Sequence, residues 1–183
     1  MRLRNQSGGI GFPSGGDRFE HLFRATSANE VRAARRRGVT VVEGGLELLA
    51  EFEPLWNETY SRLEAQPTHT RGELHDLLER LPDRIRIFCA RLDGETVAAT
   101  LALLLNDVVA YSFYHVMRAD RANINGQKVI FAHMIDRLAD SGYNWFDLGP
   151  SASLRQTTDG VVFFKEGLGG SGHLRTSWLW ETP

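Results

Sequence analysis

The sequence has little of what disulfide-stabilised, secreted or membrane-spanning proteins need. Its 183 residues include a single cysteine, Cys89, so an internal disulfide framework is excluded. The longest apolar run, Val97–Leu105, is interrupted by Thr100 and is too short to cross a bilayer. The N-terminal arginines lead into glycines rather than into an apolar segment, so no secretory signal is expected. We therefore expect a cytoplasmic protein.

Lysine is scarce, and arginine is unevenly placed. Only two lysines, Lys128 and Lys165, accompany nineteen arginines. The first 40 residues hold eight arginines against three acidic residues, whereas the rest of the chain carries a net negative charge. A basic arm therefore precedes an acidic body. We expect residues 1–28, which are rich in glycine, to be a flexible basic segment, and residues 29–183 to form one domain.

The hydrophobic periodicity predicts helices in the first half and again near the centre of the chain. Hydrophobic residues make up 42% of the sequence, which is enough for a core. Thr70 followed by Glu73 predicts a helix N-terminus, and Pro82 follows its expected end. The expected helices cover 29–37, 46–63, 70–81 and 126–141, with a short helix or turn at 161–166.

Three strand-like runs follow one another at hairpin distance, at 85–92, 96–105 and 108–116. The turn pairs Asp93-Gly94 and Asn106-Asp107 separate them and predict an antiparallel meander. The whole order predicts an α/β fold of the α+β type, with a mixed, mostly antiparallel central sheet flanked by helices. The other expected strands cover 39–43, 143–148 and 173–180.

Two residues near the C-terminus are candidates for catalysis. Lys165 follows Phe163-Phe164, so its ammonium either stabilises charge in a cleft or is an ordinary surface cation. Asp147 ends a strand before Gly149-Pro150 and either acts as a base or accepts backbone hydrogen bonds in that turn. Ser151 follows the same turn and Phe164 precedes Lys165; both are candidates for contacting substrate.

The strand at 108–116 carries three further polar candidates. Strict alternation puts Tyr111 and Tyr114 on opposite faces, with one packing and the other lining a cleft. Tyr114 is a candidate catalytic acid and Tyr111 a candidate substrate contact, although tyrosines in strands mostly serve packing. His115 is expected on the side of Tyr111, as a base or as a hydrogen-bonding partner within the sheet.

Charge recognition is expected at two places. Asn125, Gly126 and Gln127 open the expected central helix, whose first N–H groups lack internal partners and suit a phosphate. The arginines of the 29–37 helix, including Arg35 and Arg36, are either polyanion contacts or a solvated helix end. The six histidines are scattered with no metal-ligand spacing, so no metal is expected.

Several segments together resemble the GNAT acyltransferase superfamily, specifically its Fem-like branch of peptidoglycan bridge-forming aminoacyl transferases. The segments are NEVRAARRRGV at 29–39, DRIRIFCARLDGETVAATLAL at 83–103, FDLGPS at 146–151 and FFKEGLGG at 163–170. Fem-like proteins usually carry two GNAT-like halves, and the resemblance here is to the C-terminal half alone. The region from Arg121 to Gln127 keeps part of the R-x-x-G-x-G pattern with which GNAT enzymes bind coenzyme A.

The resemblance implies an N-acyltransferase or aminoacyltransferase. Its donor co-substrate would be an acyl-CoA such as acetyl-CoA, or an aminoacyl-tRNA, held near Arg121 and the helix start and between the strands at 108–116 and 143–148. The acceptor would be an amine-bearing small molecule or cell-wall precursor, and a homodimer would replace the missing half. The alternative is a non-catalytic GNAT-like binding or scaffold domain that has lost its donor site.

Overall fold

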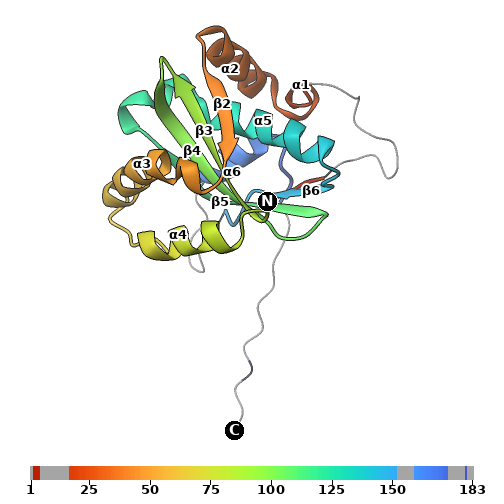
Figure 1. Cartoon of the computed structure of the whole chain (residues 1–183). Helices are drawn as coiled ribbons and strands as arrows, with labels where there is room; N and C mark the ends of the chain where they lie inside the picture. Colours follow the sequence, from red (N-terminus) through yellow and green to blue (C-terminus); the bar gives the residue numbers. More distant parts are fainter. Residues whose placement is uncertain (1, 5–16, 152–158, 173–179, 181–183) are drawn as a thin grey trace.

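The fold is a six-stranded sheet covered by helices on both faces, seen in a computed structural model (Figure 1). The structure describes residues 2–4, 17–151, 159–172 and 180. The strands are β1 (Arg2–Arg4), β2 (Thr40–Gly44), β3 (Ile85–Leu92), β4 (Glu95–Leu104), β5 (Val109–Met117) and β6 (Trp145–Asp147). The helices are α1 (Phe19–Leu22), α2 (Ala25–Arg36), α3 (Leu49–Arg62), α4 (Arg71–Arg80), α5 (Gly126–Asp140) and α6 (Asp159–Gly167), with short 3-10 turns η1 (Leu46–Leu48) and η2 (Ala119–Ile124).

The sheet order is β1-β6-β5-β4-β3-β2, and the predicted meander forms its centre. All neighbouring strands are antiparallel except β5 and β6, which run parallel and are joined through α5. The prediction of a mixed, mostly antiparallel sheet is therefore confirmed. The expected strand at 173–180 lies outside the described residues, except for Trp180 at its end.

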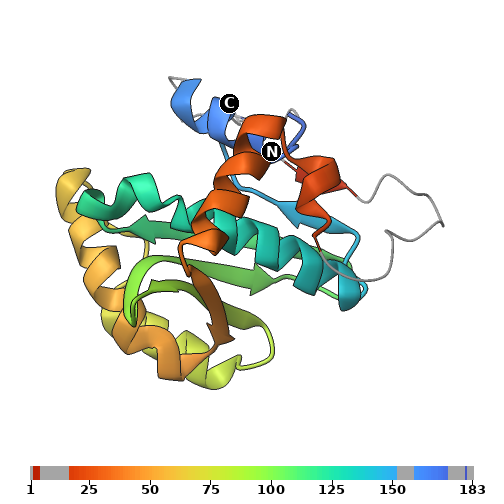
Figure 2. The same cartoon turned by 90° about the horizontal axis from the view of Figure 1, so that it is seen from above.

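Two hydrophobic clusters hold the helices to the sheet. Helices α1, α2, α5 and α6 cover one face, and α3 and α4 cover the other, as Figure 2 shows from above. The alternating side chains of the central strands divide between the clusters: Phe88 and Ala90 pack toward α5, whereas Ile87 and Cys89 pack toward α3 and α4. No helix in the described part of the chain is long and apolar enough to span a membrane.

Local signals in the sequence account for several boundaries. Thr70 and Glu73 form the predicted capping box at the start of α4. Asp93 and Gly94 both adopt positive φ, as a type I′ hairpin turn requires. The predicted helices near 46–63 and 126–141 are present as α3 and α5, each within a few residues of its expected ends.

The packed part of the chain begins earlier than expected. Helix α2 starts at Ala25, so the predicted boundary between residues 28 and 29 falls inside it. Phe19 and Phe23 are buried in the cluster shared with α5, at 1% and 6% exposure. The Arg18 guanidinium reaches Asp136 and Asp140 of α5 at 3.4 and 2.6 Å. The composition of this segment did not predict its packing, because the two phenylalanines stand among glycines and charged residues.

Candidate functional site

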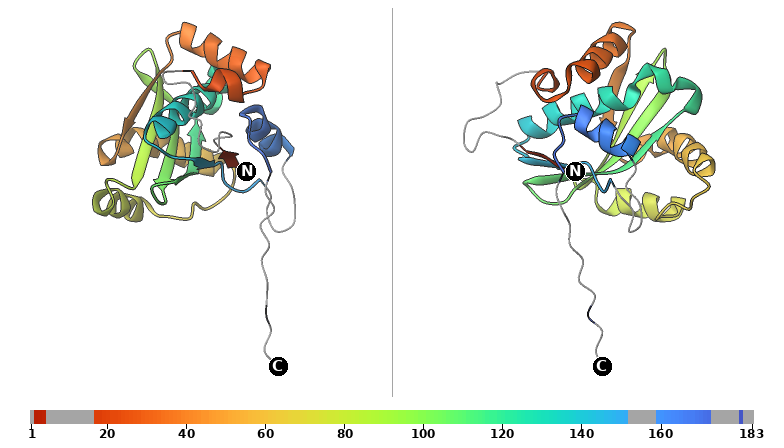
Figure 3. Two further views of the ribbon diagram at one scale, coloured as in Figure 1. Left: turned by 90° about the vertical axis from the view of Figure 1, so that its right-hand side faces the viewer. Right: turned by 180° about the vertical axis from the view of Figure 1, so that it is seen from behind.

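The sheet opens between β5 and β6, and a cavity lies beside the opening. The two strands pair only from Val109 with Trp145 to Tyr111 with Asp147, whereas β5 continues to Met117. The cavity, of about 430 Å³, is lined by the second half of β5, the start of α5 and one side of α6. Figure 3 shows α6 beside α5, and ring contact between Phe131 and Phe164 at 5.8 Å joins the two helices.

The start of α5 presents backbone N–H groups to this cavity. Asn125, which precedes the helix, adopts a left-handed conformation at φ 59° and makes no side-chain cap. The N–H groups of Lys128 and Val129 bond to the Asn125 carbonyl. Among the described residues, none accepts a hydrogen bond from the N–H of Gly126 or Gln127. These two donors, at the positive end of the helix dipole, suit an anion.

Gly126 allows the helix start to lie directly on the sheet. A Cβ at this position would lie 3.0 Å from the Cβ of Ala98 and 3.2 Å from Val97 Cγ2. A bulge at Val97, which has no partner where β3 and β4 change register, turns Val97 and Ala98 toward the same cavity. A side chain on Gly126 would therefore fill the place where α5, β4 and the cavity meet.

Four cationic side chains line the cavity, and none of the carboxylates in the described part of the chain does. They are Arg62 at the end of α3, Arg121 in η2, Lys128 in α5 and Lys165 in α6. Both lysines of the chain are among them. Lys128 pairs with Glu30, and Arg121 lies 3.7 Å from Glu95, but Arg62 has no acidic partner among the described residues. The cavity therefore favours a ligand with several negative charges.

Lys165 occupies the inner wall of the cavity. The side chain is 6% exposed, and its ammonium donates hydrogen bonds to the carbonyl oxygens of Gly149 and Pro150 at 3.0 and 2.6 Å. One of its three N–H groups is left for another acceptor. Burial lowers the pKa of Lys165 to about 8, and the nearby carboxylate of Asp147 opposes part of that shift. Lys165 is thus a buried cation that exchanges its proton near neutral pH.

His115 is the cavity residue whose role the sequence left open. Its ring packs against Phe131 of α5 at 5.3 Å, and the Ser112 hydroxyl lies 3.0 Å from its Nε2. The surrounding protein, and next the positive charge of Lys165, lower the pKa of His115 to about 4. The residue is nevertheless exposed to solvent, and it lines the cavity. The imidazole is neutral at neutral pH and can accept a proton or a hydrogen bond.

A β-bulge at Phe113 reverses the predicted sides of β5. Leu101 of β4 pairs with Tyr114, and Ala102 pairs with Ser112, which leaves Phe113 without a partner. The extra residue shifts the alternation, so His115 faces α5, whereas Tyr114 packs with the α3 and α4 side. The prediction that His115 shares the side of Tyr111 is therefore wrong.

Tyr111 and Tyr114 belong to one aromatic cluster instead of opposite faces. Both rings contact Phe113, at centroid distances of 5.8 and 4.6 Å. Tyr114 is 3% exposed, and its hydroxyl accepts a hydrogen bond from the His69 backbone at 3.2 Å. Neither tyrosine lines the cavity that contains Lys165. Tyr114 thus lies on the opposite side of the sheet from Lys165 and cannot act with it. The bulge causes this placement, and strict alternation along the strand did not predict it.

Asp147 and Gln127 are also engaged in holding the fold. Asp147 is 2% exposed, and its carboxylate accepts the Gly149 N–H at 2.9 Å, which is the turn role that the sequence offered as an alternative. The Gln127 amide donates to the carbonyls of Ala99 and Val116 at 2.9 and 2.7 Å and so ties α5 to two strands. Only the backbone N–H of Gln127 is left to bind the acyl-donor substrate.

The remaining predicted residues divide between the cavity and the surface. Phe164 lines the cavity, and Ser151 lies just beyond the turn that Lys165 holds. Arg35 and Arg36 do not line it. Arg35 pairs with Asp17, and its guanidinium lies 4.8 Å from the centroid of the Phe19 ring. Arg36 is exposed near the end of α2. The structure thus assembles Lys165, Phe164, Arg121 and the start of α5, but not the α2 arginines.

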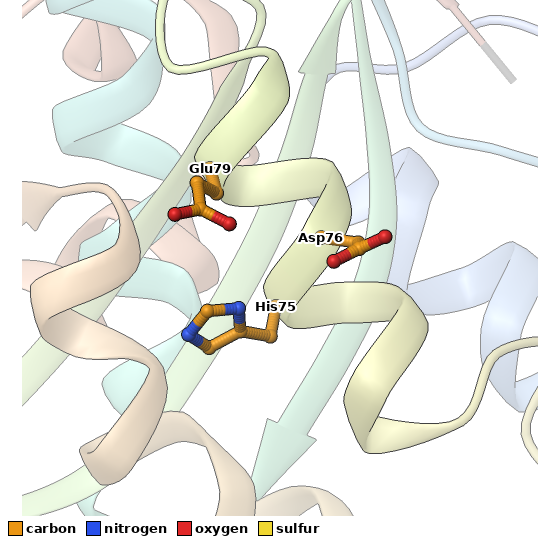
Figure 4. Close-up of side chains that lie close together, drawn as sticks. All are labelled: His75, Asp76 and Glu79. Atoms are coloured by element: carbon orange, nitrogen blue, oxygen red, sulfur yellow. The ribbon is translucent and has the colours of Figure 1, made fainter.

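One group of metal-ligand side chains appears outside the cavity. Ligand atoms of His75, Asp76 and Glu79 lie within 4.8 Å of one another on α4, and Figure 4 shows all three projecting from that helix. The sequence predicted no histidine with a metal-ligand spacing, whereas these three residues are neighbours on one helix. All three side chains are exposed, and Asp76 pairs with Arg80 at 3.3 Å.

Cys89 is not a nucleophile, because burial raises its pKa to about 12.

Comparison with known proteins identifies the class of the fold. A family model described as "Acetyltransferase (GNAT) domain" matches residues 21–159. The chain therefore belongs to the GNAT family, and the predicted fold is confirmed. A comparison with curated proteins found no match.

Solved structures agree with this assignment. The crystal structure of FemX is similar with a TM-score of 0.69 and 15% identity, over 82% of this chain and 56% of FemX. An aminoglycoside acetyltransferase from an uncultured soil metagenomic sample, in complex with sisomicin, aligns with a TM-score of 0.59 and 12% identity, over 79% of this chain and 95% of that one. The C-terminal domain of a putative lysylphosphatidylglycerol synthetase from Agrobacterium fabrum aligns with a TM-score of 0.55 and 17% identity, over 78% of this chain and 45% of that one. At these identities the likeness concerns the fold, and the chain spans little more than half of FemX.

Proposed function

We propose that this protein is an N-acyltransferase that takes an acyl group from an acyl-CoA and transfers it to an amine. The observation that carries the proposal is the cavity beside β5. Among the residues that the structure describes, it combines free helix N–H groups with four cations and no lining carboxylate. Coenzyme A carries its negative charge on phosphates, which match these donors. A solved neighbour, the acetyltransferase AAC(6′)-Iy, is in complex with a bisubstrate analogue that contains CoA.

The donor would lie with its pyrophosphate at the N–H groups of Gly126 and Gln127, near Arg62 and Arg121. The pantetheine arm would then follow the apolar wall of the cavity, where Phe131 and Phe164 lie. This path brings the thioester toward the opening between β5 and β6, where Lys165 and His115 lie. Binding would use the charges at the cavity mouth, and the chemistry would take place at the inner wall.

The reaction needs an oxyanion stabilised and one proton moved. The amine nitrogen attacks the thioester carbonyl carbon, the oxygen takes up the carbonyl electron pair, and the carbon–sulfur bond then breaks to release the thiolate. We assign Lys165 to the developing negative charge, because its ammonium is buried and fixed by two carbonyls. Neutral His115 would accept the proton that the amine loses. Proximity of the two substrates would supply most of the rate.

Thermal-shift titration with CoA, acetyl-CoA and aminoacyl-tRNA tests the choice of donor. A ligand present at a hundred times its Kd stabilises the folded state by about 2.7 kcal/mol, which corresponds to a rise in Tm of roughly 5–10 °C at this chain length. The proposal expects this rise with CoA and acetyl-CoA, and a smaller one when Arg62 and Arg121 are replaced by Gln. Stabilisation by none of the donors would favour the alternative of a scaffold domain that has lost its donor site.

An aminoacyl-tRNA donor is the second candidate. It is supported by the similarity to FemX and by the partial R-x-x-G-x-G pattern, which keeps Arg121 and Gly126 but lacks the remaining glycine. Arg36 and Arg37 are exposed at the end of α2 and have no acidic partner among the described residues. The acceptor would be an amine-bearing small molecule or cell-wall precursor. Stabilisation by aminoacyl-tRNA but not by CoA would select this donor.

A further inference from the structure

A second cavity lies on the opposite face of the sheet, between α4 and the edge of the meander. Its volume is about 500 Å³, and it shares no lining residue with the cavity beside α5. Ten of its twelve lining residues are apolar, and eight of those are leucines. The space opens to solvent, and an open apolar pocket of this size is a candidate site for an apolar ligand.

The cavity runs from an open apolar mouth to a closed floor. Leu81 and Leu105 line the mouth and are 44% and 56% exposed, which is unusual for leucines that lie close together. Leu78 and Leu101 line the floor and are each 1% exposed. The space therefore ends at these two side chains. A thin, flexible chain can lie along the exposed leucines and end at this floor.

One charged side chain, Arg84, lines the cavity among the described residues. The other lining residue that is not apolar is His69, and no carboxylate of the described residues lines the space. Arg84 stands at the mouth, since its backbone bonds to Leu81 and Leu104. Its guanidinium pairs with Asp107 at 3.2 Å, but both side chains are about half or more exposed, at 49% and 92%. Such a pair contributes little, so an anionic ligand can compete for Arg84.

We propose that this cavity binds one unbranched aliphatic chain with a single negative charge at its end, that is, a medium-chain fatty acid. The carboxylate would meet Arg84 at the mouth, and the chain would lie among the leucines down to Leu78 and Leu101. Leucine side chains surround an aliphatic chain without demanding polar partners, and the arginine fixes its direction. The site is separate from the proposed acyl-donor site, so it holds whether or not the protein is an acyltransferase.

Calorimetric titration with octanoate, decanoate and dodecanoate, each below its micelle concentration, tests the proposal on the full chain. Each added methylene should tighten binding about fourfold until the cavity is filled, because a buried methylene contributes about 0.8 kcal/mol. Leu77→Phe, which adds a ring to the lining, should abolish binding of the longest acid first. Leu63→Phe is the matched control, since Leu63 is 61% exposed and lies outside the cavity.

A second pair of variants tests the direction of the ligand. Arg84→Gln should weaken the binding of decanoate several-fold and leave the binding of decanol unchanged. Arg80→Gln, one turn away on the exposed end of α4, should change neither affinity. Affinity that does not depend on chain length, or that survives in Leu77→Phe, would overturn the proposal. So would sedimentation showing that the mouth is covered by a second copy of the chain, with a dimer that Leu81→Asn dissociates.

Discussion

Lys165 of α6 donates a hydrogen bond of 2.6 Å to the carbonyl oxygen of Pro150, in the segment that follows β6. This bond, with the one to Gly149, fixes the inner wall of the cavity beside β5. It also explains why a lysine is tolerated at 6% exposure, since a buried cation without acceptors would be costly. The same residue thus shapes the site and places a positive charge in it.

Replacing Lys165 with Met should separate these two contributions. Loss of the ammonium removes a donor from the buried Gly149 carbonyl and from the part-buried Pro150 carbonyl, which costs about 1–3 kcal/mol of stability. If Lys165 also stabilises the oxyanion, acyl transfer should fall about a hundredfold in kcat while the Kd for the donor stays nearly constant. Lys165→Arg should not restore the rate fully, because a planar fork does not replace a compact charge.

Steady-state kinetics and thermal melts of the same samples check this prediction. Wild-type turnover in the folded Met variant would reduce Lys165 to a structural tie between α6 and the turn. The pH profile gives an independent reading: because the pKa of Lys165 is lowered to about 8, the rate should decline above that pH. The Met variant should lack this alkaline limb.

Acid stability should depend on His115. Its pKa in the folded state is lowered to about 4, below the ordinary value of 6.5, so the unfolded chain binds the proton first as the pH falls. The neutral ring therefore contributes stability above pH 6.5 that is lost as the pH falls toward 4. His115→Gln should flatten the pH dependence of urea unfolding in this window.

His75→Gln provides the control for this measurement, since His75 is exposed on α4. An unchanged slope between pH 4 and 6.5 in His115→Gln would mean that His115 titrates as it does in the unfolded chain. The cavity would then hold a charged imidazole at mildly acidic pH, and His115 could accept a proton only above about pH 6.5.

The order of the elements could be predicted from the sequence, but the sides of β5 could not. Hairpin turns such as Asp93-Gly94 and the capping box at Thr70 are local signals, and the structure confirms both. The bulge at Phe113 has no such local signal, because it depends on how β4 and β5 pair while each strand also packs against the helices on both faces of the sheet. One unpaired residue moved Tyr114 out of the site and His115 into it.

Long-range contacts explain the other differences. The sequence predicted a phosphate at the first backbone N–H groups of α5, but it did not predict that the Gln127 side chain donates to the carbonyls of Ala99 and Val116, which are distant along the chain. Likewise, no sequence pattern near Lys165 predicts that its ammonium donates hydrogen bonds to the carbonyls of Gly149 and Pro150. Which cations converge on one cavity is settled by the fold, and Arg62 was missed because its helix offered no motif.

Arg62 and Arg121 should bind the phosphates of the donor. Replacing both with Gln should weaken the binding of CoA about tenfold, since exposed charge contacts contribute about 0.5–1 kcal/mol each to the binding free energy. The affinity of the double variant should also depend less on salt, because fewer charges attract the ligand. Titrations at two salt concentrations check this, with Arg71→Gln, on α4 and outside the cavity, as the control. Equal affinity in wild type and double variant would place the phosphates elsewhere.

Binding of tRNA, if it occurs through α2, should depend on Arg36 and Arg37. Arg32 and Arg35 are already paired with Glu20 and Asp17, whereas Arg36 and Arg37 are exposed without such partners among the described residues. Replacing the exposed two with Gln should reduce the slope of log affinity against log salt by roughly one to two. Filter binding at several salt concentrations measures the slope. An unchanged slope would make these residues a solvated helix end.

Gly126→Ala should damage both the fold and the donor site. The new methyl group would lie 3.0 Å from the Cβ of Ala98 and 3.2 Å from Val97 Cγ2, so α5 and β4 must separate locally by a few tenths of an ångström. Overpacking of this kind costs about 1–3 kcal/mol, and the shift should weaken CoA binding because the N–H donors of the helix start move with it. Gly72→Ala is the matched control: Gly72 lies in the first turn of α4, and a Cβ added there would meet no other atom within 4 Å, so alanine should be neutral or stabilising.

Ala98→Gly added to Gly126→Ala decides whether the clash is the cause. Removing the nearer methyl group makes room for the new one, so the double variant should regain part of the stability and of the CoA affinity that the single variant lost. Urea unfolding and calorimetric titration of the four proteins in the cycle measure both quantities. Purely additive losses would show that Gly126 acts through its backbone alone, and that its close approach to Ala98 is not what positions the start of α5.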